Sequence, residues 1–136
     1  MHTLHSTIKK SGGRLTKTKQ ALLEVLASQH CLLSKATIIK QLQRKHVTPN
    51  RSTLYRELVF LVKHHIINQS TINGTDYFEL AHQHHHHLVC LGCNNIERVD
   101  MDNHLTKQEQ YITKQHQFNI INHLLEFYGY CQKCQN

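Results

Sequence analysis

Residues 49–80 read PNRSTLYRELVFLVKHHIINQSTINGTDYFEL, and this stretch decides the fold. Asn50 follows the only proline of the chain and is a good N-cap, because its side chain can accept a hydrogen bond from an orphan amide of a first helical turn. Apolar residues then recur at mostly helical intervals from Leu54 to Val62. Beyond them, Asn73-Gly74 separates two strand-like runs, which is a strong signal for a β-hairpin.

Two more helices are expected before this stretch. Residues 16–27 carry apolar side chains at helical spacing, and a second helix begins after Ser34, which can cap its first turn, and runs toward His46. Three helices and a hairpin predict a winged helix-turn-helix over residues 1–81.

The second half begins at a break in composition, because five of the seven residues from Ala81 to His87 are histidine. A strand from His86 to Cys90, a return strand over residues 96–99, a helix over residues 102–116 and a long strand from Phe118 to Tyr128 are predicted next. The whole chain is therefore predicted to be α+β, with residues 82–136 forming an α/β second domain.

The net charge of +7 is unevenly spread. Residues 1–80 hold twelve Lys or Arg and four Asp or Glu, whereas residues 81–136 hold four and five. This asymmetry favours a polyanionic partner for the first half alone, with a merely solvated basic surface as the alternative.

Two C-x-x-C pairs, Cys90 with Cys93 and Cys131 with Cys134, predict a structural zinc site. Each pair places two thiolates on one turn, and four sulfurs fill a zinc tetrahedron without leaving a position for water. The first residues lack an apolar core of signal-peptide length, so we expect a cytoplasmic protein without a membrane segment. In that reducing compartment, redox pairs or disulfides are the weaker interpretation.

The histidine tract predicts further metal binding. On a strand, His84 and His86 would face one way, and His85 and His87 the other, so one stretch can serve two sites. A solvated polar loop is the alternative for such a tract. An enzyme is not predicted, because no phosphate loop or nucleophile pattern stands out and the paired cysteines belong to a closed site.

From residue 10 to residue 134 the sequence resembles the ferric uptake regulator family. The resemblance rests on Arg14-Leu15-Thr16, Ser52-Thr53-Leu54-Tyr55-Arg56-Glu57-Leu58, Asn73-Gly74, His84-His85-His86-His87-Leu88-Val89-Cys90-Leu91-Gly92-Cys93, His123 and Gly129-Tyr130-Cys131-Gln132-Lys133-Cys134. It implies a homodimeric repressor, with residues 82–136 as the dimerisation domain, that binds double-stranded operator DNA when a regulatory metal is present. It also implies DNA contacts from the third helix in the major groove and from a basic residue in the minor groove, by Arg14, Ser52, Thr53, Tyr55 and Arg56.

The resemblance further implies two metal sites besides the structural zinc. The regulatory one is an inter-domain site of His30, Glu79, His85 and His87. The second takes His84, His86 and His123 with a carboxylate, and here the sequence departs from the family pattern. The expected acidic position holds Leu105 or Thr106, so His104 and Glu109 both remain candidates.

Fe²⁺ is slightly favoured over Zn²⁺ as the regulatory metal, because the candidate ligands are imidazoles and carboxylates and include no cysteine. A zinc-uptake or peroxide-sensing regulator of the same family is the alternative. A histidine-rich metal store or chaperone is the rival from another class, and the recognition helix argues against it because a store does not need one.

Overall fold

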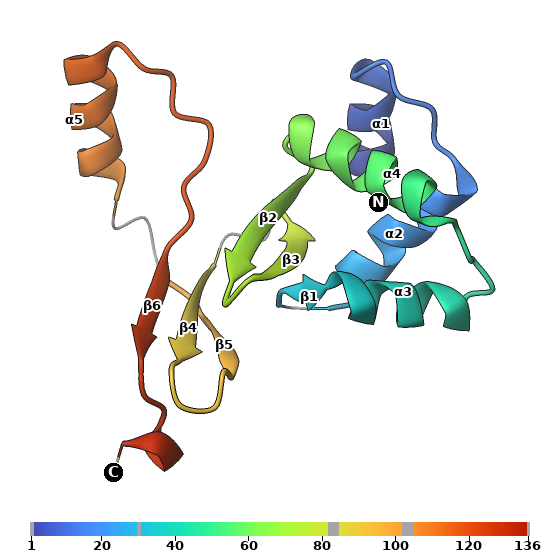
Figure 1. The fold of residues 1–136 in the computed structure, drawn as a ribbon. Helices are drawn as coiled ribbons and strands as arrows, with labels where there is room; N and C mark the ends of the chain where they lie inside the picture. The colour runs from blue at the N-terminus through green and yellow to red at the C-terminus, as the bar shows by residue number, and fades with distance from the viewer. Residues whose placement is uncertain (1, 30, 82–84, 102–104, 136) are drawn as a thin grey trace. The chain divides into compact units, whose positions relative to one another are not determined.

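The chain folds into two compact units, Met1–Gln83 and His84–Asn136, here named the N-terminal and the C-terminal unit. This computed structural model describes residues 2–29, 31–81, 85–101 and 105–135 (Figure 1). The class is α+β, as predicted. The roles predicted for residues 1–81 and 82–136 stay predictions.

Helices dominate the N-terminal unit: α1 (His2–Lys10), α2 (Lys17–Ala27), α3 (Lys35–Arg44) and α4 (Arg51–Lys63). Thr16, Ser34 and Asn50 cap the last three, each accepting a hydrogen bond from the backbone N–H three residues on. These bonds satisfy donors that a helix leaves open at its start. The predicted caps at Ser34 and Asn50 are thus confirmed, whereas α1 was not predicted.

A hairpin follows α4, made of β2 (Ile67–Ile72) and β3 (Thr75–Leu80) (Figure 1). Asn73 and Gly74 form its turn with φ values of 51° and 77°, a left-handed conformation that these two residue types tolerate best. The short β1 (Leu33–Ser34) pairs with the outer side of β3, giving the antiparallel order β1-β3-β2. The predicted winged helix-turn-helix is therefore present.

One apolar core holds the N-terminal unit together. Its fully enclosed side chains include Ile8, Leu22, Leu23, Ile38, Leu42 and Leu61. Burying a side chain of this size contributes about 1.5–3 kcal/mol. Ile8 explains why α1 forms, because this helix contributes one fully buried residue to a core built by the other helices.

The described residues of the C-terminal unit form a three-stranded sheet, one α-helix and one 3₁₀ helix. Strand β4 (His86–Cys90) lies at the centre, antiparallel to β5 (Ile96–Val99) and parallel to β6 (Glu126–Gly129), as Figure 1 shows. Helix α5 (Thr106–His116) connects β5 to β6, and the short 3₁₀ helix η1 (Gln132–Cys134) follows β6.

The predicted strand from Phe118 to Tyr128 is wrong for most of its length. Only Glu126 to Gly129 pair with β4, which is itself five residues long, and residues 118–125 have no regular structure. Apolar side chains alone do not make a strand, and residues 118–124 pair with no strand among the described residues. Helix α5 also begins at Thr106 rather than at residue 102; residues 102–104 lie outside the described part.

Few apolar side chains of the described C-terminal unit are buried. Val89 is enclosed, but α5 buries none of its residues. Large apolar side chains stay exposed instead: Leu88, Leu91, Tyr111, Ile112, Phe118, Ile121, Leu124, Phe127, Tyr128 and Tyr130. Across the described residues of both units, no helix is long and apolar enough to cross a membrane.

Candidate metal centres and nucleic-acid interface

The four paired cysteines meet at one end of the C-terminal sheet. Cys90 ends β4, Cys93 lies in the following turn, Cys131 follows β6 and Cys134 ends η1. Parallel pairing of β4 with β6 sets Cys90 opposite Gly129, two residues before Cys131, and so brings the two pairs together. All four sulfurs lie within 4.8 Å of one another.

The spacing of these sulfurs fits a tetrahedral metal ion. Cys93 Sγ and Cys131 Sγ are 3.9 Å apart. A zinc tetrahedron with Zn–S bonds of about 2.3 Å has S···S edges of about 3.8 Å. The same distance is far too long for a disulfide bond, and the five cysteines are free thiols.

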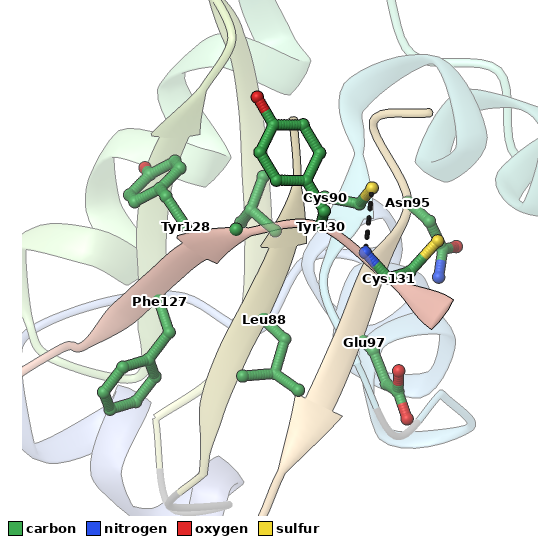
Figure 2. Close-up of a pocket in the computed structure, with 10 residues that line it drawn as sticks. Leu88, Cys90, Asn95, Glu97, Phe127, Tyr128, Tyr130 and Cys131 are labelled. Atoms are coloured by element: carbon green, nitrogen blue, oxygen red, sulfur yellow. Dashed lines mark hydrogen bonds between the residues drawn. The ribbon is translucent and has the colours of Figure 1, made fainter. Parts of the chain in front are cut away.

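The protonation of the cluster shows why it suits a cation. The backbone N–H of Cys131 donates to Cys90 Sγ at 3.3 Å (Figure 2), and this bond, with those from Cys93 and Gly92, lowers the pKa of Cys90 to about 6. The neighbouring thiols of Cys131 and Cys90 raise the pKa of Cys134 to about 12. The first thiolate forms readily, but the last needs a compensating positive charge.

A second cluster joins β4, α5 and the segment before β6. The His86 and His123 rings are stacked with their centroids 5.2 Å apart, and the Glu109 carboxylate contacts Nδ1 of His123. Three residues predicted for the second metal site are therefore brought together. His84 and His104 lie outside the described residues. Imidazole and carboxylate ligands suit Fe²⁺ and Zn²⁺ alike.

The predicted inter-domain ligands belong to both units. Glu79 lies in β3 of the N-terminal unit, whereas His85 precedes β4 and His87 lies within it. The His85 and His87 rings meet edge to face with centroids 4.8 Å apart, and His86 stacks on His123 instead. His85, His86 and His87 thus alternate as predicted, whereas His84 lies outside the described residues. His30 lies outside the described residues, and the assembly of the four-ligand site stays a prediction.

Helix α4 has an apolar face buried in the core and a polar face exposed to solvent. Leu54, Leu58 and Leu61 are buried in the core. Ser52, Tyr55 and Arg56 are exposed on the other side, with Tyr55 61% exposed, and Thr53 is half-buried. Helical periodicity places these residues near one another in the first two turns. Such a set suits phosphates, base edges and thymine methyl groups.

The start of α4 and the loop before α2 complete this candidate interface. Asn50 Oδ1 accepts hydrogen bonds from the Thr53 N–H at 2.8 Å and from Ser52 Oγ at 3.1 Å, which fixes the first turn of α4. Arg14, the fifth predicted DNA contact, is exposed in the loop between α1 and α2.

Lys19, which was not predicted as a functional residue, has its side chain buried beneath this candidate interface. Lys19 precedes Leu22 and Leu23 by three and four residues, so it occupies a position on the inward face of α2. A lysine at a position where helical periodicity expects an apolar residue is a signal that was present in the sequence.

Comparison with known proteins agrees with this architecture. The model of the ferric uptake regulator family matches residues 10–128. The ferric uptake regulation protein of Helicobacter pylori is 28% identical over 137 residues, which cover 99% of this chain and 91% of that protein. The peroxide operon regulator of Bacillus subtilis is 28% identical over 132 residues, covering 94% and 88%.

A solved structure matches along the same length. The Helicobacter pylori ferric uptake regulator, whose structure revealed three functional metal-binding sites, aligns with a TM-score of 0.73 at 27% identity, covering 99% of this chain and 91% of that one. The family match spans most of the chain and includes α4, β4 with its histidines, and the first cysteine pair. Members of the family are transcriptional regulators rather than enzymes. The chain belongs to the ferric uptake regulator family of metal-responsive transcriptional regulators.

Proposed function

We propose that this protein is a cytoplasmic, metal-dependent repressor that binds double-stranded operator DNA as a homodimer, with Fe²⁺ as its co-repressor. The observation that carries the proposal is the exposed polar face of α4, with Tyr55 and Arg56, in a unit that also carries the excess of basic residues. Major-groove reading needs such a helix, and phosphate binding needs such a charge.

The four cysteines hold a structural Zn²⁺ in this proposal. Their sulfur spacing and the absence of a fifth donor in the described cluster support a closed tetrahedral site. Bound zinc would supply the positive charge that the four thiolates need. It would also tie the end of the chain after β6 to the end of β4.

Regulation depends on the histidine tract, residues 84–87, and its partner ligands. In the inter-domain site, His30, Glu79, His85 and His87 bind the regulatory metal, and its ligands come from both units. In the second site, His86, Glu109 and His123 bind metal together with His84, and the contact between Glu109 and His123 supports Glu109 over His104 as the remaining ligand. A ligand set contributed by two units lets metal binding select one arrangement of the DNA-reading units.

The metal must prefer the DNA-binding arrangement by a minimum free energy. A metal that moves a two-state equilibrium from about 1:99 to about 99:1 must prefer the DNA-binding arrangement by about 5.5 kcal/mol. Several metal–ligand bonds made in only one arrangement supply a preference of this order. Metal-free protein would sample other arrangements and bind DNA weakly.

The exposed apolar surface of the C-terminal unit supports a homodimer. Leu88 on β4 lies opposite Phe127 on β6 (Figure 2). The two side chains are 40% and 44% exposed. The exposed apolar residues of α5 and of residues 118–124 add to this surface. Apolar area of this extent in a unit with so small a core is typical of an obligate interface.

The test is a DNA-binding titration of the full chain with its structural zinc in place. A duplex is first selected from random DNA with protein in buffered Fe²⁺ under anaerobic conditions, and in parallel with Zn²⁺ and with Mn²⁺. The dissociation constant for the selected duplex is then measured against each free metal concentration. We expect binding that requires metal and responds to Fe²⁺ at the lowest free concentration.

Variants connect binding to the proposed ligands. His85→Ala and His87→Ala should abolish the metal response, whereas His116→Ala, which removes an exposed histidine from the end of α5, should preserve it. Equal DNA affinity with and without every metal would overturn the co-repressor mechanism. If the protein bound many metal ions weakly and selected no duplex, the result would support a metal store. If peroxide treatment of the Fe²⁺ form abolished DNA binding, the result would support a peroxide sensor.

A further inference from the structure

Lys19 is a charged residue inside the N-terminal unit, and the function proposed above does not use it. Only 4% of its surface is exposed. Lysine is almost never buried to this extent unless its ammonium group is paired. The contacts of that group therefore indicate what the residue does.

Three groups surround the ammonium group of Lys19. It donates to the backbone carbonyl of Arg14 at 2.9 Å, forms an ion pair with Glu57 Oε2 at 3.3 Å, and lies 4.0 Å from the centroid of the Phe60 ring. Glu57 and Phe60 belong to α4, whereas Arg14 belongs to the loop before α2. One buried cation thus joins α2, α4 and the loop.

Two further contacts close this network. Thr16 Oγ1 donates to Glu57 Oε1 at 3.1 Å while it accepts from the backbone N–H of Lys19 at 3.0 Å. The loop also packs directly on α4, because a Cβ added at Gly13 would overlap the Phe60 ring. The backbone around Arg14 is therefore held against Glu57 and Phe60, two partly buried side chains of α4.

The same two segments carry the proposed DNA contacts. Arg14 is exposed in the loop, and Arg56 is the immediate neighbour of Glu57 on the solvent side of α4. A side chain that reaches the minor groove and a helix that reads the major groove must keep a fixed separation, because both grooves belong to one rigid duplex.

We infer that Lys19 is a positioning residue for DNA recognition: its buried ammonium group fixes the Arg14 loop against α4, so that Arg14 and α4 engage the two grooves together. This inference rests on the proposed function. Lys19 itself does not reach the DNA, because its charge is enclosed by Arg14, Glu57 and Phe60. Lys19 therefore affects DNA affinity only by positioning Arg14.

The experiment is a double-mutant cycle between Lys19 and Arg14, measured on the full zinc-containing chain with the selected duplex and its preferred metal. Lys19→Met keeps the length of the side chain and removes its charge. We expect it to weaken DNA binding about tenfold, the loss of one specific contact. In an Arg14→Ala background the same substitution should change affinity by less than about twofold, because the contact it positions is already absent.

Three variants separate positioning from folding. Lys19→Met/Glu57→Gln leaves no unpaired buried carboxylate, so it should unfold near the wild-type temperature yet still bind DNA weakly. Lys19→Arg should restore affinity to within roughly threefold, since a guanidinium group can pair with Glu57 and stack on Phe60. Lys17→Met removes an exposed charge from the same helix, and any effect it has should be equal in both Arg14 backgrounds.

The salt dependence of binding supplies a second measurement. Lys19→Met should reduce the slope of log affinity against log salt by about one, as Arg14→Ala does, because the positive charge of Arg14 is no longer held against the duplex in either variant. Wild-type affinity in the folded Lys19→Met/Glu57→Gln variant, or an undiminished Lys19→Met effect in the Arg14→Ala background, would overturn the inference alone. A wild-type protein that selects no duplex would overturn the proposed function, and this inference with it.

Discussion

Glu109 and His123 are 14 residues apart in the sequence, yet the Glu109 carboxylate contacts Nδ1 of His123. The helix start makes this contact possible, because α5 begins at Thr106 and so places Glu109 in its first turn. His123 in turn stacks on His86 of β4. Three potential metal ligands from three separate segments thus form one cluster.

Replacing Glu109 with glutamine is expected to weaken metal binding at the second site. The amide keeps the shape of the carboxylate but loses its charge, and carboxylates that ligate a metal or orient its histidine ligands contribute at least about tenfold to affinity. The measurement is a competition titration against a chelator, with the structural zinc already bound. Glu97→Gln removes an exposed carboxylate from β5 and should leave this affinity unchanged. Equal affinities of wild type and Glu109→Gln would remove Glu109 from the ligand set.

Substituting Gly13 with alanine should destabilise the N-terminal unit. The added Cβ would fall on the Phe60 ring, with ring carbons Cε1 and Cε2 at 2.9 and 3.0 Å. Overpacking of this kind typically costs about 1–3 kcal/mol in the free energy of unfolding, which urea denaturation measures. The double variant Gly13→Ala/Phe60→Leu has a smaller side chain at position 60 and so relieves the overlap. Its loss in the free energy of unfolding should be smaller than the sum of the losses in Gly13→Ala and Phe60→Leu. If the losses in the free energy of unfolding of the two single variants simply added in the double variant, Gly13 and Phe60 would not be in contact.

Local chemistry made much of the N-terminal unit predictable. Ser34 and Asn50 cap helices where expected, since a capping side chain acts within four residues of the chain. Asn73-Gly74 forms the hairpin turn for a similarly local reason. Helix α1 was missed because its one fully buried residue, Ile8, gives no recognisable period.

Non-local pairing made the C-terminal unit harder to predict. The parallel contact of β4 with β6 joins residues about 40 positions apart, and nothing within either segment specifies it. The C-x-x-C spacing still predicted which cysteines meet, because it is itself a local pattern. Glu109 could not be separated from His104 by sequence, because that choice depends on where α5 begins.

Two residues of α4, one buried and one exposed, should separate stability from recognition. Leu61 is fully buried, and its replacement with alanine is expected to cost about 2–5 kcal/mol in the free energy of unfolding. Tyr55 is 61% exposed, so Tyr55→Ala should change stability by less than about 0.5 kcal/mol while it weakens binding to the selected duplex. Urea denaturation and DNA titration of both variants check this. A large stability loss in Tyr55→Ala would assign that ring to packing.

Gly92 and Gly129 offer a matched pair of tests for the cysteine cluster. A Cβ at Gly92 would lie 2.9 Å from Cys134 Cβ and 3.0 Å from Cys134 Sγ, whereas a Cβ at Gly129 meets nothing within 4 Å. Neither residue has a positive φ, so backbone strain does not distinguish the two substitutions. The difference between them therefore reports contact with the Cys134 thiol.

Gly92→Ala is expected to displace Cys134 from its position and to weaken zinc retention, while Gly129→Ala behaves as the wild type. In the proposed zinc site four thiolates share one cation, so displacing a single sulfur lowers the affinity of the whole site. Zinc release to a chromogenic chelator, followed over time, measures the difference, and thermal unfolding of each zinc-bound variant measures its effect on stability. If both variants released zinc at the wild-type rate, the cluster would tolerate a shifted Cys134, and a rigid four-sulfur site would be the wrong description of it.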